Sequence, residues 1–197
     1  MTPFEIYHSS YSHLYRGDYK TGFDAFEYRW HPDVMPTVNE PYTKHPENVP
    51  AWQGESLLGK SICVQMEQGY GDMIQFARFL PALKMLGASK VVVMIPESLF
   101  ELFGQLECID VITNDWEQGE PANCDYWIAS LSLPYFLSFT PSYVRNLFPI
   151  NKDKVALSEG YLDVLPSNIP PKVGVNWACS KTFSHFLRSI SAEEMIK

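Results

Sequence analysis

The sequence contains no apolar run that approaches the roughly 20 residues needed to span a bilayer. Its first residues, MTPFEIYHSSYSHLYRGDY, also lack the cationic start and apolar core of a signal peptide. Both absences favour a soluble chain, and we expect a cytoplasmic protein with no membrane span.

Positive charge and clustered cysteines are scarce as well. Lys and Arg total 15 against 23 Asp and Glu, a formal net charge of −8, whereas nucleic-acid binding needs a basic face. The four cysteines lie far apart with no CxxC pair, so the short ligand spacing of a zinc site is missing. The composition therefore predicts no nucleic-acid partner, no metal site and reduced thiols.

What the chain does contain is enough apolar material for a packed domain. Hydrophobic residues make up 46% and aromatic residues 14% of its 197 residues, which excludes a disordered chain. This length accommodates one well-buried domain and an appendage.

The first 30 residues have the pattern of two short helices. Apolar side chains recur at helical spacing in Phe4–Tyr15 and in Tyr19–Trp30. Gly17 can end the first helix and Asp18 can cap the second. Residues 31–57 hold five prolines and little periodicity, and they read as an extended connector that rejoins a packed body near Trp52 and Gly54.

From Leu58 onward the pattern alternates between buried strands and helices. A parallel α/β sheet with right-handed crossovers is the expected fold, with ligands bound at the carboxyl ends of its strands. We predict strands at 61–66, 90–96, 109–113, 124–130 and 170–180, and helices at 72–86 and 97–106.

The segment GYGD follows the first predicted strand. Gly69 and Gly71 permit positive φ angles and a close backbone approach, but a third glycine is missing and no GK[ST] follows. A nicotinamide, flavin or P-loop site is therefore disfavoured. Asp72 either caps the next helix or acts as a general base, and Glu67 and Gln68 can supply polar contacts to a ligand.

A late loop, ACSKTFSHFLRS, follows the last predicted strand. Ser180, Lys181 and Arg188 form a group suited to phosphate, although a plain basic loop reads equally well.

Four segments of the chain share one resemblance: RGDYKTGFDAFEYRW, Trp52–Pro81, CDYWIASLSLP and KVGVNWACS…RSI. They resemble tetratricopeptide-repeat-associated glycosyltransferase-like proteins, which are similar to the heptosyltransferases of glycosyltransferase family 9. RGDYKTGFDAFEYRW looks like the last helix pair of a tetratricopeptide array, and Trp52–Pro81 looks like the start of the following domain. CDYWIASLSLP and KVGVNWACS…RSI are similar to later segments of that family.

This resemblance implies the GT-B architecture of two facing Rossmann-like domains. It divides the chain into a tetratricopeptide-like helical hairpin (1–30), a proline-rich connector (31–57), the GT-B N-terminal domain (58–170) and the start of a truncated second domain (171–197). Asp72 would be the catalytic base of an inverting, metal-independent transferase. Gly69, Gly71, Glu67 and Gln68 would contact substrate. Ser180, Lys181 and Arg188 would bind the donor phosphates.

The resemblance further implies sugar transfer from a nucleotide sugar to a hydroxyl of a carbohydrate or protein acceptor, with no other cofactor. Because most of the donor domain would lie outside the sequence, we expect the lone chain to be incomplete and to need a partner chain or a homo-oligomer. The alternative hypothesis is a non-catalytic binding or scaffold module that keeps the acceptor-side fold and oligomerises.

Overall fold

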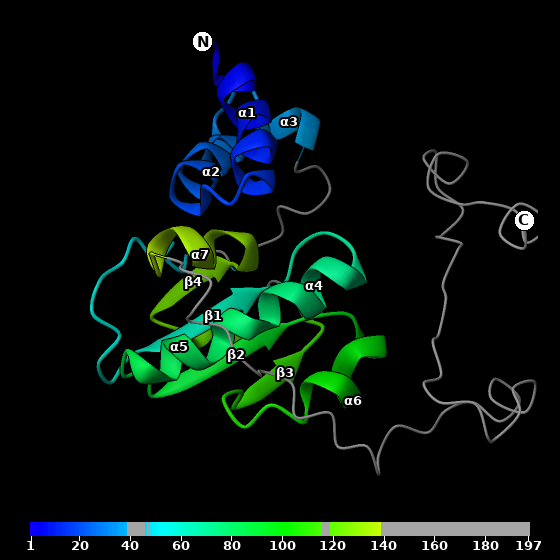
Figure 1. The fold of residues 1–197 in the computed structure, drawn as a ribbon. Coiled ribbons are helices and arrows are strands. Elements are labelled where there is room, and N and C mark those ends of the chain that lie inside the picture. Colours follow the sequence, from blue (N-terminus) through cyan, green and yellow to red (C-terminus); the bar gives the residue numbers. More distant parts are fainter. Residues whose placement is uncertain (39–45, 47, 116–118, 139–197) are drawn as a thin grey trace, which may run out of the picture. The chain divides into compact units, whose positions relative to one another are not determined.

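The computed structural model describes residues 1–38, 46, 48–115 and 119–138 (Figure 1). The chain divides into a unit of Met1–Pro149 and a unit of Ile150–Lys197, and all described residues belong to the first. The predicted strand at 170–180, the predicted phosphate loop and the second domain therefore lie outside the described residues.

A sheet of four parallel strands is the centre of this unit, which confirms the predicted α/β class. The strands are β1 (Ser61–Gln65), β2 (Lys90–Met94), β3 (Val111–Thr113) and β4 (Tyr126–Ala129), in the order β3-β2-β1-β4. Cys63 of β1 is in register with Val92 on one side and with Trp127 on the other. The chain builds outward from β1 to β3 and then returns to the opposite side of β1, an arrangement consistent with a Rossmann-like domain.

One face of the sheet carries the main hydrophobic core. Strand residues alternate between faces, so Ile62, Val64 and Met66 of one segment point to the same side. In Figure 1, α4 (Tyr70–Phe76) and α5 (Leu80–Met85) lie over the strands, and α6 (Phe100–Phe103) lies near β3. The core on this face includes Ile62, Val64, Val91, Val93, Ile95, Leu80, Leu83, Phe103 and Leu133.

The other face has a smaller cluster. Cys63, Val92 and Met94 are each fully buried there and pack with Val49 and Cys124. β1 and β2 are buried on both faces, which explains why their sequences are continuous apolar runs. The prediction that these strands are buried is confirmed.

The helix predicted at 72–86 begins two residues earlier and is interrupted. It starts at Tyr70, becomes a 3₁₀ turn at Ala77–Phe79 and resumes as α5. Pro81 has no N–H to donate to the Ala77 carbonyl, and the Leu80 N–H bonds that carbonyl instead. The helix predicted at 97–106 is likewise shorter, a 3₁₀ turn (Glu97–Leu99) followed by α6.

The N-terminal helices are α1 (Pro3–Tyr15) and α2 (Tyr19–Phe26), and together with the 3₁₀ turn that follows them (Glu27–Trp30) they are here called the helical hairpin. Gly17 has φ +80° after the first helix, and the Asp18 carboxylate accepts the Thr21 N–H at 3.4 Å, as predicted. The second helix does not continue to Trp30 in α form, because Glu27–Trp30 is a 3₁₀ turn. A tetratricopeptide-like arrangement stays a prediction.

The connector is not wholly extended. A short helix, α3 (Met35–Val38), follows the buried Val34, and Pro36 is tolerated in its first turn, where no intrahelical donor is needed. Further on, Trp52 is only 3% exposed, so the chain does rejoin the packed body there. Pro134 lies in the first turn of a further helix, α7 (Leu133–Phe136).

Candidate functional site

The carboxyl ends of β1 and β4 lie side by side at the point where the strand order reverses. Open parallel sheets bind their ligands outside this edge. The loop after β1 carries Glu67 and Gln68, and the turn after β4 carries Ser130 and Ser132, so polar side chains of two distant segments meet here.

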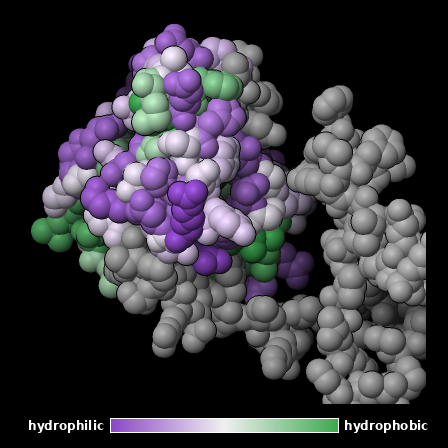
Figure 2. Space-filling view, turned by 45° about the horizontal axis from the view of Figure 1, so that its top comes forward, coloured by the Kyte–Doolittle hydropathy of each residue, from purple (hydrophilic) through white to green (hydrophobic). Residues whose placement is uncertain are grey.

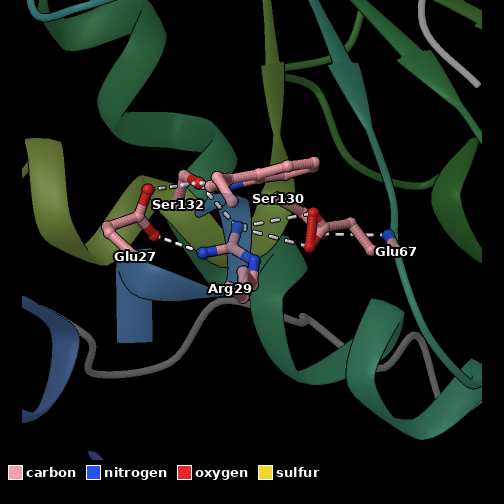
Figure 3. Close-up of polar contacts among 6 residues, drawn as sticks. Glu27, Arg29, Glu67, Ser130 and Ser132 are labelled. Carbon is pink, nitrogen blue, oxygen red and sulfur yellow. Dashed lines mark hydrogen bonds and ion pairs between the residues drawn. The ribbon is translucent and has the colours of Figure 1, made fainter. Parts of the chain in front are cut away.

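A buried arginine from the helical hairpin occupies this edge (Figure 3). Arg29 is 1% exposed, and its guanidinium lies between Glu27 and Glu67. Nη2 donates to Ser132 Oγ at 2.6 Å and lies 3.4 Å from Glu67 Oε1, while Nη1 is ion-paired with Glu27. The Ser132 hydroxyl donates in turn to Glu27 Oε2 at 2.9 Å. We call Glu27, Arg29, Glu67 and Ser132 the Arg29 cluster.

Aromatic rings enclose the guanidinium. Its central carbon lies 4.8 Å from the ring centroids of both Phe26 and Trp30, a distance at which a cation is attracted to a π face. The 3₁₀ turn at Glu27–Trp30 thus supplies a carboxylate, the guanidinium and an aromatic ring to one site.

Glu67 is 3% exposed and is held from two directions. Its carboxylate faces Arg29, and its backbone N–H donates to Ser130 Oγ at 3.2 Å. Burial raises the pKa of Glu67, and the nearby Arg29 charge opposes that rise without cancelling it. The sequence offered Glu67 as a ligand contact, and the structure gives its carboxylate a partner inside the protein.

Asp72 is exposed in the first turn of α4, and its Oδ2 accepts the Gly69 N–H at 3.2 Å. The capping interpretation of this residue is therefore observed, whereas its role as a base stays a prediction. The interpretation of the two glycines needs a correction. Neither Gly69 nor Gly71 has a positive φ, and the left-handed residue of the turn is Gln68, with φ +67°.

A pocket of about 390 Å³ opens beside Asp72, and we call it the Asp72 pocket. The helical hairpin, the loop after β1 and α4 all contribute to its lining, which includes Tyr7, Tyr11, Phe26, Gln68, Gln75 and Phe76. The Tyr7 and Tyr11 hydroxyls are hydrogen-bonded to each other, and burial raises the pKa of Tyr7 well above its usual value. The sequence analysis missed the hairpin residues, because nothing local to residues 4–30 indicates where the two helices dock.

A larger cavity of about 600 Å³ lies beside β4, and we call it the tryptophan pocket. Its lining includes Trp30, Trp52, Trp127, Tyr135, Phe136 and Glu27. The sequence analysis missed this pocket too, since its aromatic residues come from four separate segments with no shared spacing.

Two findings on the described residues are negative. No three His, Cys, Asp or Glu side chains of the described part gather into a group that could hold a metal ion. No helix of that part combines the length and the apolarity needed to cross a bilayer. The predicted donor-phosphate residues Ser180, Lys181 and Arg188 lie outside it.

Comparison of the chain with models of protein families, with curated proteins and with solved structures found no match. The functional class is therefore inferred from the residues and their geometry alone.

Proposed function

We propose that the Met1–Pro149 unit is the acceptor side of an inverting, metal-independent glycosyltransferase, with Asp72 as its general base. One observation carries the proposal. An exposed carboxylate at the carboxyl edge of a parallel sheet opens onto a pocket lined by phenol, amide and aromatic side chains.

The lining of the Asp72 pocket suits a carbohydrate. The amides of Gln68 and Gln75 each offer donors and an acceptor, which match sugar hydroxyls. Phe26 and Phe76 add apolar surface for the C–H faces of a sugar ring. A volume of about 390 Å³ is within the range of small-ligand pockets.

The proposed step is a single displacement. The Asp72 carboxylate takes the proton of the acceptor hydroxyl as its oxygen attacks the anomeric carbon of the donor. The new glycosidic C–O bond forms on one face while the bond to the nucleoside diphosphate breaks on the other, so the configuration inverts. The hydrogen bond from the Gly69 N–H to Oδ2 holds the carboxylate in place for this role. Ser180, Lys181 and Arg188 would bind the departing diphosphate.

The test is an activity assay of the full chain with a panel of nucleotide sugars and saccharide acceptors. The measured quantity is the nucleoside diphosphate that is released. We expect Asp72→Asn to lower the rate by about 10²- to 10⁴-fold, the usual contribution of a general base. Glu101→Gln is the matched control, because Glu101 is also an exposed carboxylate in the first turn of a helix. Equal rates in both variants would refute the base assignment.

The second candidate is the non-catalytic module that associates with itself or another chain. Three large apolar side chains favour it, because Leu58, Met85 and Leu86 are 79%, 75% and 47% exposed. Gly59 N–H donates to Gly87 O at 2.9 Å, so Leu58 and Leu86 flank one backbone contact. On the face drawn in Figure 2, the coloured surface is mostly hydrophilic, with small and separate hydrophobic patches.

Light scattering distinguishes this candidate from the first. A module that associates through these side chains should form an oligomer that Leu58→Ser with Met85→Ser dissociates, and it should release no diphosphate from any donor. A monomeric wild-type chain would exclude this form of the second candidate.

A further inference from the structure

The tryptophan pocket is separate from the proposed acceptor site. It shares no lining residue with the Asp72 pocket, and it lies against Trp127, Ile128 and Ala129 of β4. The proposed sugar transfer makes no use of it.

Its walls are aromatic rings set at steep angles to one another. Trp30 and Trp127 meet edge to face with centroids 6.4 Å apart, and Tyr135 and Phe136 do so at 4.9 Å. Trp52 packs on Phe136 at 5.5 Å with a 47° tilt. Rings arranged in this way present π faces in several directions around one space.

Three of the polar side chains in these walls already have partners within the protein. The Trp30 Nε1–H donates to Ser132 Oγ at 3.3 Å, and the Trp52 Nε1–H donates to the Glu55 carbonyl at 2.8 Å. Ser132 also bonds Arg29 and Glu27. These three side chains therefore offer a polyol few unused donors and acceptors. The other polar side chains of the described lining include those of Gln53, Tyr135 and Glu27.

The one charged side chain of the described lining is acidic. Glu27 is the single carboxylate among the described lining residues, and none of those residues is Lys, Arg or His. Arg29 pairs with Glu27 from the interior but does not line the cavity. The Arg29 cluster moreover holds two carboxylates for one guanidinium.

We propose that the tryptophan pocket binds a small quaternary ammonium ligand such as choline. Such a cation carries no N–H donor. It therefore leaves no hydrogen bond unmade in a pocket where the Ser132 oxygen already accepts from other side chains. Its methyl groups fit apolar rings, its charge is attracted to their π faces, and Glu27 complements that charge. The cavity volume of about 600 Å³ exceeds what one such ligand fills, so its substituent can extend toward the exposed Tyr135.

The first experiment compares two ligands of the same shape on the full chain. Choline and its uncharged carbon isostere, 3,3-dimethyl-1-butanol, are titrated while tryptophan fluorescence is recorded, because three of the five tryptophans line the pocket. We expect choline to bind about tenfold more tightly, since only the cation gains from the rings and from Glu27. Equal affinities, or no saturable binding of choline, would overturn the proposal.

Two variants locate the site. Tyr135→Leu keeps apolar volume but removes a π face from a side chain that is 41% exposed, so folding is little affected. It should weaken choline binding several-fold and leave the isostere unchanged. Glu27→Gln should do the same, with circular dichroism to verify the fold and Glu101→Gln as the control. If Tyr135→Leu weakens the binding of both ligands equally, the pocket is an apolar cavity that does not recognise the cation.

A peptide that carries trimethyllysine presents the same group on a protein. If free choline binds more tightly than the peptide, the result supports a small molecule as the ligand. If the peptide binds more tightly, the proposal of a small-molecule ligand is overturned. Because neither titration depends on Asp72, failure of the glycosyltransferase proposal leaves this result unaffected.

Discussion

At the scale of single residues, a costly feature of the Arg29 cluster is the burial of Arg29 and Glu67, beside a Glu27 side chain that is 19% exposed. Desolvating charges is expensive, and the cost is recovered only when each charge has well-placed partners. Arg29 has two carboxylates, a hydroxyl and two aromatic rings around it. Removal of one partner should therefore lower the free energy of unfolding by far more than the loss of its hydrogen bonds alone.

Arg29→Met tests this directly. We expect a loss of about 3–5 kcal/mol in the free energy of unfolding, because Glu67 would be left as a buried, uncompensated carboxylate. Chemical denaturation measures the change, and Arg78→Met on an exposed part of the surface is the control. Adding Glu67→Gln to Arg29→Met should recover part of the loss, and strict additivity of the two substitutions would contradict the pairing.

Glu67 should also make stability depend on pH. Burial raises the folded-state pKa, so the folded protein holds this proton more tightly than the unfolded chain does. The favourable contribution is complete below the pKa of an ordinary Glu and is lost as pH rises through the folded-state pKa. The stability of Glu67→Gln relative to wild type should therefore increase as pH rises from about 4 toward neutrality. A difference that is constant over this range would show that Glu67 titrates normally.

At the scale of elements, the turn between β1 and α4 departs from the sequence expectation in an informative way. Two glycines were available for the left-handed position, yet Gln68 occupies it with φ +67°. A side chain is strained in that conformation, and the position is also in the lining of the Asp72 pocket. Backbone strain at a residue that lines a pocket makes its side chain a candidate for a functional role.

Gln68→Gly should accordingly stabilise the protein by about 0.5–1 kcal/mol, since glycine adopts this φ without strain. Gln75→Gly within α4 should destabilise it by about 1 kcal/mol, because glycine weakens a helix interior. Thermal or chemical unfolding of both variants provides the comparison. Destabilisation by Gln68→Gly would mean that amide contacts outweigh the backbone strain.

Local patterns predicted the elements well and their ends less well. The apolar runs of β1 and β2 and the cap at Asp18 follow from short-range rules, and the structure confirms them. The 3₁₀ turn at Glu27–Trp30 did not follow from such rules. It positions Arg29 beneath Ser132, a residue 103 positions away, and helical periodicity contains no information on that pairing.

At the scale of the whole described unit, the helical hairpin and the sheet are joined by a polar cluster and an apolar one. Tyr7 and Phe26 of the hairpin pack with Val34, Leu131 and Phe76. The sequence predicted both parts, but not the surface on which the hairpin docks. Both candidate pockets depend on that docking, so neither could be located from the sequence.

We therefore expect the hairpin and the sheet to unfold together. Hydrogen exchange should give amides of α1 and of β1 similar opening free energies in the wild-type chain, and Arg29→Met should lower both. Exchange of α1 amides at much lower free energy than those of β1 would show that the hairpin opens on its own.

The return of the connector at Pro50–Trp52 has a consequence for the edge of the sheet. The Trp127 N–H donates to the Pro50 carbonyl at 3.0 Å, and the Trp52 N–H donates to the Trp127 carbonyl at 2.8 Å. The outward-facing backbone groups of Trp127 are thus occupied by a short segment that contains a proline, which has no N–H to offer a further strand. At this position, β4 is closed to the edge-to-edge pairing through which exposed sheets grow into aggregates.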